Sequence, residues 1–426
     1  MESAASVAAA AVDITIVMPC LNEARSVGPC IATAQRALGR LWQSHGLTGD
    51  IVVADNGSTD GSQIVADRLG ARVIAVTRRG YGAALLGGFA AARGRYLVMG
   101  DADGSYDFND VVPMVEALAA GADLCMGSRF IGGIKPGAMP WKNRYLGNPV
   151  LTAVLNFLFR AGVGDAHCGL RALTARCFER LRLSGSGMEF ASEMVIKAAL
   201  LGEKIVETPV TLYPDLRDRP PHLRPWRDGW RHLRYLLMLS PAWLFAVPAA
   251  VGAVFSLMIL AAAGIVWLRA AGEADFFFGN YWTILAGSLL GISHVGLILA
   301  LACRIYGVRE GYRRPGRVTR FLSRWVSLET MLIGGVLIVL AGFGVLAAVV
   351  GYWSARDFSR IGNVLPAVVG STLLAIGVQN IFGGFLLAVI GGNEAQFLAQ
   401  PAEDHRAPDG VCYRPSPAVA AGAPKS

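Results

Sequence analysis

Residues 95–105 read RYLVMGDADGS, an apolar run that ends in two acids. The first half has the length and composition of a buried strand. Asp101 and Asp103 follow it directly, with one alanine between them. Two carboxylates this close repel each other unless a cation lies between them, and Mg²⁺ or Mn²⁺ accepts such oxygen ligands together with substrate phosphates. The stretch therefore predicts a strand that leads into a metal-binding turn.

Short apolar runs alternate with helical patterns on both sides of this stretch. We expect strands at 13–18, 50–54, 72–76, 95–100, 122–127 and 204–212. Helices are expected at 23–44, 59–69, 82–93 and 109–119. This alternation predicts an α/β domain with a Rossmann-like, mostly parallel sheet and helices on both faces. Ligands of such sheets bind beyond the carboxyl ends of the strands, so the turns after the strands form the candidate site.

Polar turns also follow the first two expected strands, at 19–23 (PCLNE) and 55–60 (DNGSTD). Asn22, Asp55 and Thr59 are good helix-starting residues as well, and for Thr59 we prefer capping to a role in binding. The glycines at 80–82 do not form a dinucleotide-binding fingerprint. They follow the third strand rather than the first, and a leucine stands where the last glycine of that motif belongs.

The composition of the whole chain indicates two different kinds of domain. Of its 426 residues, 54% are hydrophobic and only 16% are charged, where about a quarter charged is usual for a soluble domain. The excess lies in four long uncharged stretches, at 242–268, 281–303, 328–353 and 363–391. Each exceeds the roughly 20 residues that a helix needs to cross a membrane. The composition excludes a disordered chain, a disulfide-rich mini-protein and a collagen-like fibre.

Arginines flank the expected membrane helices unevenly. They gather at 217–234, before the first span, and at 304–324, between the second and third spans. By the positive-inside rule both segments lie in the cytoplasm. The first twelve residues lack the basic start and the long apolar core of a cleaved signal peptide. We therefore expect a multi-pass integral protein of the bacterial inner membrane whose N-terminal domain is cytoplasmic.

The expected organisation has five parts. These are a flexible N-terminus at 1–12, the α/β domain at 13–223, a juxtamembrane amphipathic helix at 224–240, an all-α four-helix transmembrane domain at 241–392 and a disordered tail at 393–426. Residues 144–160 and 224–239 are apolar on one side and basic, as is typical of helices that lie in a membrane interface. For 144–160, an ordinary core helix is the alternative.

A few polar residues interrupt the expected spans. His294, Gln379 and Asn380 are interpreted as groups that bond between neighbouring helices, although intramembrane polar groups can be functional. The glycine pairs at 334–335 and 383–384 predict close helix packing.

The order and spacing of several motifs resemble one family. Pro-x-x-Asn-Glu after the first strand, Asp-Asn-Gly-Ser-Thr-Asp after the second and Asp-Ala-Asp after the fourth are similar to the GT-A glycosyltransferases of family 2. Four further motifs, beginning at Gly127, Trp141, Asp165 and Met188, resemble the dolichyl-phosphate mannosyltransferases and related bacterial polyprenyl-phosphate glycosyltransferases. The likeness covers about residues 12–240.

The resemblance implies a donor site for a UDP- or GDP-linked sugar. The residues that would hold the base and the ribose are Pro19, Leu21, Glu23 and Asp55, with Asp55 accepting a hydrogen bond from the base. The family's Asp-x-Asp motif is matched by Asp101, Ala102 and Asp103. In it Asp103 would ligate Mg²⁺ or Mn²⁺ directly, and Asp101 would face the metal through water or the ribose. Ser105 stands where the family often has a longer polar metal ligand.

The resemblance also implies a site for the acceptor phosphate. Arg129 and Arg144 match the positions that hold it, and the planar, permanently charged guanidinium suits phosphate oxygens. Arg171 either joins this cluster or pairs with Glu189 or Glu193.

Two further pairs of residues have open roles. Arg217 or Arg219 would fold over the donor diphosphate, or would anchor the chain to anionic lipid. Asp165 and His167 are candidate catalytic bases, and the alternatives are a turn or cap residue for the aspartate and a hydrogen-bonded pocket residue for the histidine.

The resemblance implies an inverting, metal-dependent transfer of one sugar from a nucleotide to a polyprenyl phosphate on the cytoplasmic face. A processive polysaccharide synthase is one alternative, but its Gln-x-x-Arg-Trp motif is missing, because Phe321 stands where the glutamine would be. A transport or flippase partner with a nucleotide-binding domain is the other, although the spans lack paired charges. We expect the nucleotide sugar, the lipid and the membrane as partners, and no nucleic acid. A homo-oligomer is left open.

Overall fold

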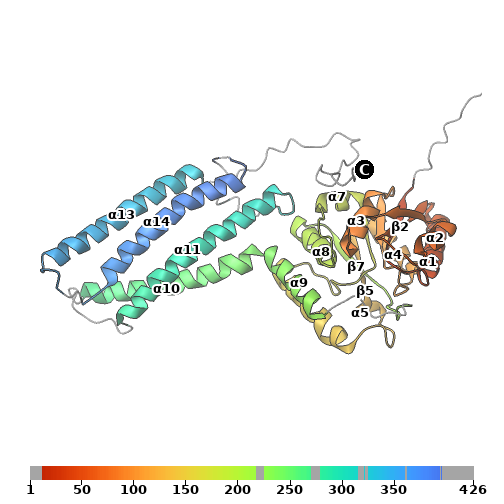
Figure 1. The fold of residues 1–426 in the computed structure, drawn as a ribbon, viewed down its shortest axis with the longest axis horizontal. Helices are drawn as coiled ribbons and strands as arrows, with labels where there is room; N and C mark the ends of the chain where they lie inside the picture. The colour runs from red at the N-terminus through yellow and green to blue at the C-terminus, as the bar shows by residue number, and fades with distance from the viewer. Residues whose placement is uncertain are drawn as a thin grey trace, which may run out of the picture.

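The computed structural model describes residues 12–216, 225–269, 279–314, 321, 325–359, 362–393 and 395. It has two parts, an N-terminal α/β domain and a C-terminal bundle of long helices (Figure 1). Helix α9 (Pro225–Met238) joins them, and its Leu236 is buried in the core of the α/β domain. Side chains at 225–228 and 231 lie outside the described residues.

A seven-stranded sheet forms the centre of the α/β domain. Its strand order is β3-β2-β1-β4-β6-β5-β7. The strands are β1 (Ile14–Cys20), β2 (Gly49–Asp55), β3 (Arg72–Ala75), β4 (Tyr96–Met99), β5 (Leu124–Ser128), β6 (Arg171–Thr174) and β7 (Ile205–Pro209). All neighbours pair in parallel except β6, which is antiparallel to β4 and β5. The predicted mostly parallel sheet is confirmed, whereas β6 was not predicted.

Helices cover both faces of this sheet, as expected. One face packs against α1 (Val27–His45), α2 (Ser62–Arg68), η1 (Phe108–Asp110) and α4 (Val111–Ala119). The other packs against α3 (Tyr81–Ala90), α6 (Asn148–Phe159), α7 (Ala175–Leu181), α8 (Glu189–Leu201) and the end of α9. The short helix α5 (Arg129–Gly132) follows β5 directly. Sequence patterns did not predict α5, α7 or α8.

The stretch 144–160 serves the soluble core with one of its faces. It forms the π-helical turn η2 (Asn143–Gly147) and then α6. Thr152, Leu155 and Phe159 are buried, while Val150 and Phe157 are exposed. The core-helix alternative therefore holds for the inner face, and the outer face presents apolar side chains to the surroundings.

Within the part of the chain that the structure describes, four helices are long and apolar enough to cross a membrane, and they match the four predicted spans. The first joins η3 (Ala242–Ala246) to α10 (Val247–Arg269), and the others are α11 (Gly279–Arg309), α13 (Leu328–Ser354) and α14 (Leu365–Ile390). They lie side by side beyond the α/β domain (Figure 1).

Glycines let α13 and α14 approach closely. A Cβ atom added at Gly377 would lie 2.7 Å from the carbonyl oxygen of Gly335, so neither position has room for a side chain. The Asn380 amide donates to the Met331 carbonyl at 2.8 Å, which confirms the predicted bond between helices for this residue. Gln379 instead lines a groove of about 640 Å³ between α11 and α14.

Candidate active site

Three strands bring the polar turns to one edge of the sheet. Cys20, the last residue of β1, pairs with Asp55, the last residue of β2. Val17 of β1 pairs with Met99 at the end of β4. The turns after β1, β2 and β4 therefore leave the same edge, as the parallel arrangement predicts.

The turn after β4 holds its two carboxylates differently. Asp103 is buried, and its Oδ1 accepts a hydrogen bond from the Ser105 amide at 2.9 Å. Gly104 between them has a φ of +83°, a conformation that glycine adopts without strain. Asp101 is half-buried and is hydrogen-bonded by the Tyr81 phenol of α3. Burial and the charge of Asp101 raise the pKa of Tyr81 well above its ordinary value, so the phenol stays a donor.

This turn suits a divalent cation that is shared with a substrate. The described residues contain no group of three or more His, Cys, Asp or Glu side chains placed to hold a metal. Mg²⁺ needs fewer, because one or two carboxylates, substrate phosphates and water complete its shell. Asp101 and Asp103 provide those carboxylates, and Ala102 between them is buried. Ser105 lies beside the turn, and its role as a third ligand stays a prediction.

The residues expected around the nucleoside lie at the same edge. Pro19 belongs to β1, and Leu21 lies in the turn that follows. The buried Glu23 accepts a hydrogen bond from Ser26 at 3.0 Å. The Asp55 carboxylate accepts from the Gly57 and Ser58 amides at 3.1 Å each, and from the Gln63 side chain at 3.0 Å. These bonds make Asp55 a turn-holding residue in the structure, and its contact with a base stays a prediction.

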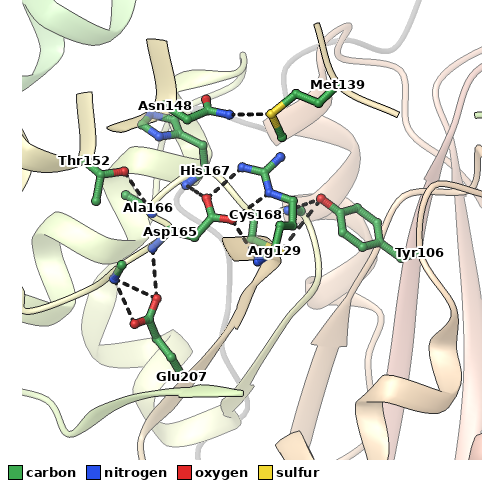
Figure 2. Close-up of polar contacts among 12 residues, drawn as sticks. Tyr106, Arg129, Met139, Asn148, Thr152, Asp165, Ala166, His167, Cys168 and Glu207 are labelled. Atoms are coloured by element: carbon green, nitrogen blue, oxygen red, sulfur yellow. Dashed lines mark hydrogen bonds and ion pairs between the residues drawn. The ribbon is translucent and has the colours of Figure 1, made fainter. Parts of the chain in front are cut away.

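Arg129 and Asp165 form a buried ion pair that was not predicted. Arg129 Nε lies 2.7 Å from Oδ2 of Asp165, and Nη2 lies 2.7 Å from Oδ1 (Figure 2). The Arg129 amide donates to the same carboxylate at 3.1 Å. Although burial alone would raise it, these hydrogen bonds and the arginine's charge hold the pKa of Asp165 below its ordinary value. An ionised carboxylate committed to an arginine is a poor proton acceptor, so the structure favours the turn-residue alternative for Asp165.

The loop that carries Asp165 is fastened from several directions. The amides of Gly164 and Asp165 donate to the Glu207 carboxylate of β7, and the Ala166 amide faces the Thr152 hydroxyl of α6 at 3.4 Å (Figure 2). The Tyr106 hydroxyl accepts from the Gly169 amide at 3.0 Å. These hydrogen bonds fix the backbone of the loop at both ends, next to the edge of the sheet where the polar turns lie.

Arg171 also holds this loop, through hydrogen bonds to its backbone carbonyls. It is fully buried, and its guanidinium donates to the backbone carbonyls of Cys168, Ala191 and Ala166. Neither alternative from the sequence describes these contacts, because Glu193 pairs instead with Lys197. Arg171 thus supports the loop and does not offer its guanidinium to a ligand.

His167 lies between charged neighbours. Burial first, and then the neighbouring His232, Arg129 and Arg171, lower the pKa of His167 to about 3. Its ring meets that of His232 from α9 edge-on, with centroids 5.3 Å apart. Nδ1 of His167 is buried and has no hydrogen-bond partner among the described residues. The predicted hydrogen-bonded pocket role is therefore not met at this atom.

Of the remaining predicted arginines, Arg144 lies within the described residues. Arg144 is half-exposed on η2, with its guanidinium 5.4 Å from the Tyr145 ring centroid. Its side chain is therefore more exposed than that of the buried Arg129. Arg217 and Arg219 lie outside the described residues.

The roles of two tyrosines at the site escaped the sequence analysis, and Asn56 was noted there only as part of the polar turn after the second strand. Tyr81 bonds Asp101, and Tyr106 bonds the loop at Gly169. Asn56 ties the end of β2 to the start of α3, because its Oδ1 accepts from the Gly80 amide at 2.8 Å. The sequence signal that could have drawn attention to Tyr81 is the pair of glycines on either side of it. In the structure Gly80 and Gly82 allow the backbone at Gly185 and Ser186 to approach closely, and they do not form a phosphate-binding loop.

Comparison with known proteins finds two matching family models. One, described as glycosyl transferase family 2, matches residues 15–182. The other, described as the glycosyltransferase family 2 C-terminal transmembrane region, matches residues 301–391.

Several curated proteins are similar to the chain. The low-salt glycan biosynthesis hexosyltransferase Agl6 of Haloferax volcanii is 35% identical over 379 residues, which cover 89% of each chain. The polyprenol monophosphomannose synthase of Mycolicibacterium smegmatis is 31% identical over 46% of this chain and 76% of its own length. The dolichyl-phosphate hexose transferase of Haloferax volcanii is 28% identical over 46% of this chain and 82% of its own. Among solved structures, glucosyl-3-phosphoglycerate synthase from Mycobacterium tuberculosis has a TM-score of 0.40 and 22% identity over 53% of this chain and 78% of its own.

Proposed function

Because the chain belongs to glycosyltransferase family 2 and joins a GT-A domain to that family's transmembrane region, we propose that it transfers a single sugar from a UDP- or GDP-linked donor to a polyprenyl phosphate. The chain is a membrane glycosyltransferase. The polyprenyl acceptor is suggested by the names of two relatives, the polyprenol monophosphomannose synthase and the dolichyl-phosphate hexose transferase.

One observation carries this proposal, namely the short distance between the two halves of the site. A Cβ atom added at Gly169 would lie 2.4 Å from Oδ2 of Asp101, on the donor side. The Gly169 amide donates to the Tyr106 hydroxyl, and Asp165 in the same loop binds Arg129 on the acceptor side. The loop 165–169 therefore contacts both the carboxylate turn and the arginine, which supports a transfer between two substrates held close together.

The residues present suit an acceptor that is already ionised. A lipid phosphate needs to be held and aimed, and it needs no strong base. Asp165 is occupied by Arg129, which agrees with that requirement. Arg144 would bind the acceptor phosphate directly, while Arg129, whose charge is balanced by Asp165, would offer the phosphate only N–H groups that Asp165 does not occupy. When bound at Asp101 and Asp103, Mg²⁺ or Mn²⁺ would neutralise charge on the leaving diphosphate. Attack from the opposite face would invert the anomeric centre.

An apolar surface beside the site suits a lipid acceptor. Large exposed side chains gather on η2 and α6 and just before them, namely Trp141, Tyr145, Leu146, Val150 and Phe157. The Phe157 ring meets Trp243, at the start of the first membrane helix, with centroids 4.5 Å apart. The surface would rest on the bilayer, so the lipid phosphate could reach the site at headgroup level. The arginine-rich connection after α11 supports a cytoplasmic site at the bacterial inner membrane.

The test is a transfer assay on membranes that contain the full-length chain. UDP- and GDP-linked sugars, each radiolabelled, are supplied with polyprenyl phosphate, and label in the lipid phase is counted. We expect label from one donor, its loss in EDTA, its return with Mg²⁺ or Mn²⁺, and its loss in Asp103→Ala. Asp67→Ala, at an exposed acid of α2, serves as the matched control. Unchanged transfer by Asp103→Ala would refute the site, and label found in polymer instead of lipid would refute the acceptor.

A further inference from the structure

The turn at residues 184–187 touches the donor edge through its backbone. The Ala83 amide of α3 donates to the Ser186 carbonyl at 3.0 Å. A Cβ atom at Gly80 would lie 2.1 Å from the Ser186 oxygen, and one at Gly82 would lie 2.2 Å from the Gly185 oxygen. Only glycine allows this approach. Tyr81 stands between the two glycines and is hydrogen-bonded to Asp101, so the residues on either side of it contact the turn while its own side chain contacts the carboxylate pair.

A buried ion pair on α8 holds this turn in place. The Glu193 carboxylate is fully buried, and it accepts from the Gly185 amide at 2.7 Å and from the Ser184 amide at 3.1 Å. Lys197, one helical turn further on, lies 2.7 Å from Glu193 Oε1. The Lys197 ammonium also donates to the Arg182 carbonyl at 2.7 Å, just before the turn. The N-terminal side of the turn thus depends on this one pair, whereas at the other end the Gly187 amide donates to the Glu189 carboxylate at 2.9 Å.

The pair is completed from outside the α/β domain. The Tyr312 ring, just beyond the end of α11, lies 5.7 Å from the Lys197 ammonium and packs against the soluble core. A Cβ atom at Gly307 would lie 3.1 Å from the Tyr312 ring, so this glycine leaves space for it. Arg313, the next residue, donates to the Leu239 carbonyl at 2.9 Å and fixes the segment to the end of α9. The end of α11 lies beside α8 in Figure 1.

We propose that Tyr312 is a positioning residue through which the membrane domain orders the donor site. Its ring covers the Lys197 ammonium, Lys197 and Glu193 hold the turn at 184–187, and this turn fixes Tyr81 on Asp101. The inference deepens the proposed function, and the kinetic part of its test rests on that function. It predicts that a contact at the end of a membrane helix controls affinity for the nucleotide sugar.

The experiment compares Tyr312→Ala with Tyr312→Phe in the full-length protein, reconstituted in nanodiscs. An aromatic ring over a cation is worth from about a twofold change in an equilibrium constant at an exposed site to about thirtyfold when the cation is desolvated, and phenylalanine retains the ring. We expect Tyr312→Ala to raise the KM for the nucleotide sugar three- to tenfold with a smaller change in kcat, with Tyr312→Phe within about twofold of wild type. Lys197→Met should resemble Tyr312→Ala.

Hydrogen–deuterium exchange provides a readout that needs no activity. Amides at 184–187 and at Ala83 should exchange faster in Tyr312→Ala and not in Tyr312→Phe, while amides of β1 and β2 stay unchanged. A general loss of folding would instead accelerate exchange throughout the domain and would overturn the positioning role. Unchanged exchange at 184–187 would overturn it as well. If the wild-type protein transfers no sugar, the proposed function fails, and the exchange measurement still decides this inference.

Discussion

Arg129 and Asp165 are joined by two parallel N–H···O contacts of 2.7 Å each, although 36 residues separate them in the sequence. Asp165 is fully buried, and Arg129 is 8% exposed. Such a pair is costly to break, because the partner that is left keeps an uncompensated buried charge. The arginine therefore serves the fold, in addition to the role that we propose for it at the acceptor site.

Replacing Arg129 should separate these two roles. We expect Arg129→Gln to lower the free energy of unfolding by about 3–5 kcal/mol, because Asp165 is left as a buried, unpaired carboxylate. The double variant Arg129→Gln with Asp165→Asn should be less destabilised than the sum of its single changes. Thermal unfolding of the full-length protein in detergent measures both. A variant Arg129→Gln that melts like wild type but binds acceptor poorly would show that the arginine acts only on the ligand.

Acidification should destabilise the domain through His167. In the unfolded chain a histidine takes up its proton near pH 6.5, whereas burial and neighbouring cations lower the pKa of folded His167 to about 3. Above pH 6.5 both states are neutral and the residue has no effect. Below it, only the unfolded state binds the proton, so stability falls by up to about 1.4 kcal/mol per pH unit until the folded pKa is reached.

The Asp165 carboxylate titrates in a different range. Its lowered pKa contributes stability that is present above the ordinary value near 3.9 and is lost only at lower pH. Asp165 therefore does not contribute to a change in stability between pH 6.5 and 4.5.

The role of His167 is tested by melting curves in this pH range. The fall in melting temperature between pH 6.5 and 4.5 should be smaller in His167→Gln than in wild type. Equal slopes for the two proteins would contradict the assignment to His167. The groups facing this ring are His232, Arg129, Arg171 and Asp165.

Arg144 should affect the acceptor without affecting the fold. It is half-exposed, and its described contact is with its neighbour Tyr145. We therefore expect Arg144→Ala to raise the KM for polyprenyl phosphate about tenfold or more, since it removes a charge-assisted contact, and to leave the melting temperature unchanged. Arg36→Ala, on the exposed face of α1, is the matched control. Unchanged acceptor kinetics in Arg144→Ala would remove this residue from the site.

Local patterns were sufficient to predict the strands that carry the site. The run before Asp101 is apolar and ends in a turn, and parallel pairing then brings this turn beside Asp55 without further information. The four membrane helices were equally readable, because uncharged stretches of that length have few other uses. In contrast, β6 has only four residues, too few for a periodic pattern to be distinctive.

Long-range partners could not be predicted in this way. The sequence marks Asp165 and Arg171 as polar residues of one motif, but it does not say which groups they meet. The fold places Arg129 against Asp165 and directs Arg171 to backbone carbonyls, because β6 runs antiparallel and carries the loop back beside β5. Whether Arg171 binds a ligand or supports the loop depends on how deeply its side chain is buried. Its guanidinium is buried against the Ala191 carbonyl of α8, a helix that was not predicted.

A single methyl group at Gly169 should disturb the Asp101–Asp103 turn, our proposed metal site, while leaving every charge in place. The added Cβ atom would lie 2.4 Å from Oδ2 of Asp101 and 3.1 Å from the Tyr106 ring, so the carboxylate must move. We expect Gly169→Ala to lower kcat/KM about 10- to 100-fold, the size of effect that misplacing a catalytic group by about 1 Å produces. Gly39→Ala in α1 has open space around the new atom and should keep full activity.

The assay that tests Gly169→Ala is sugar transfer at saturating and at limiting Mn²⁺. If Gly169→Ala recovers at high Mn²⁺, the displaced carboxylate is a metal ligand, whereas wild-type activity at every Mn²⁺ concentration would place Asp101 outside the reacting site.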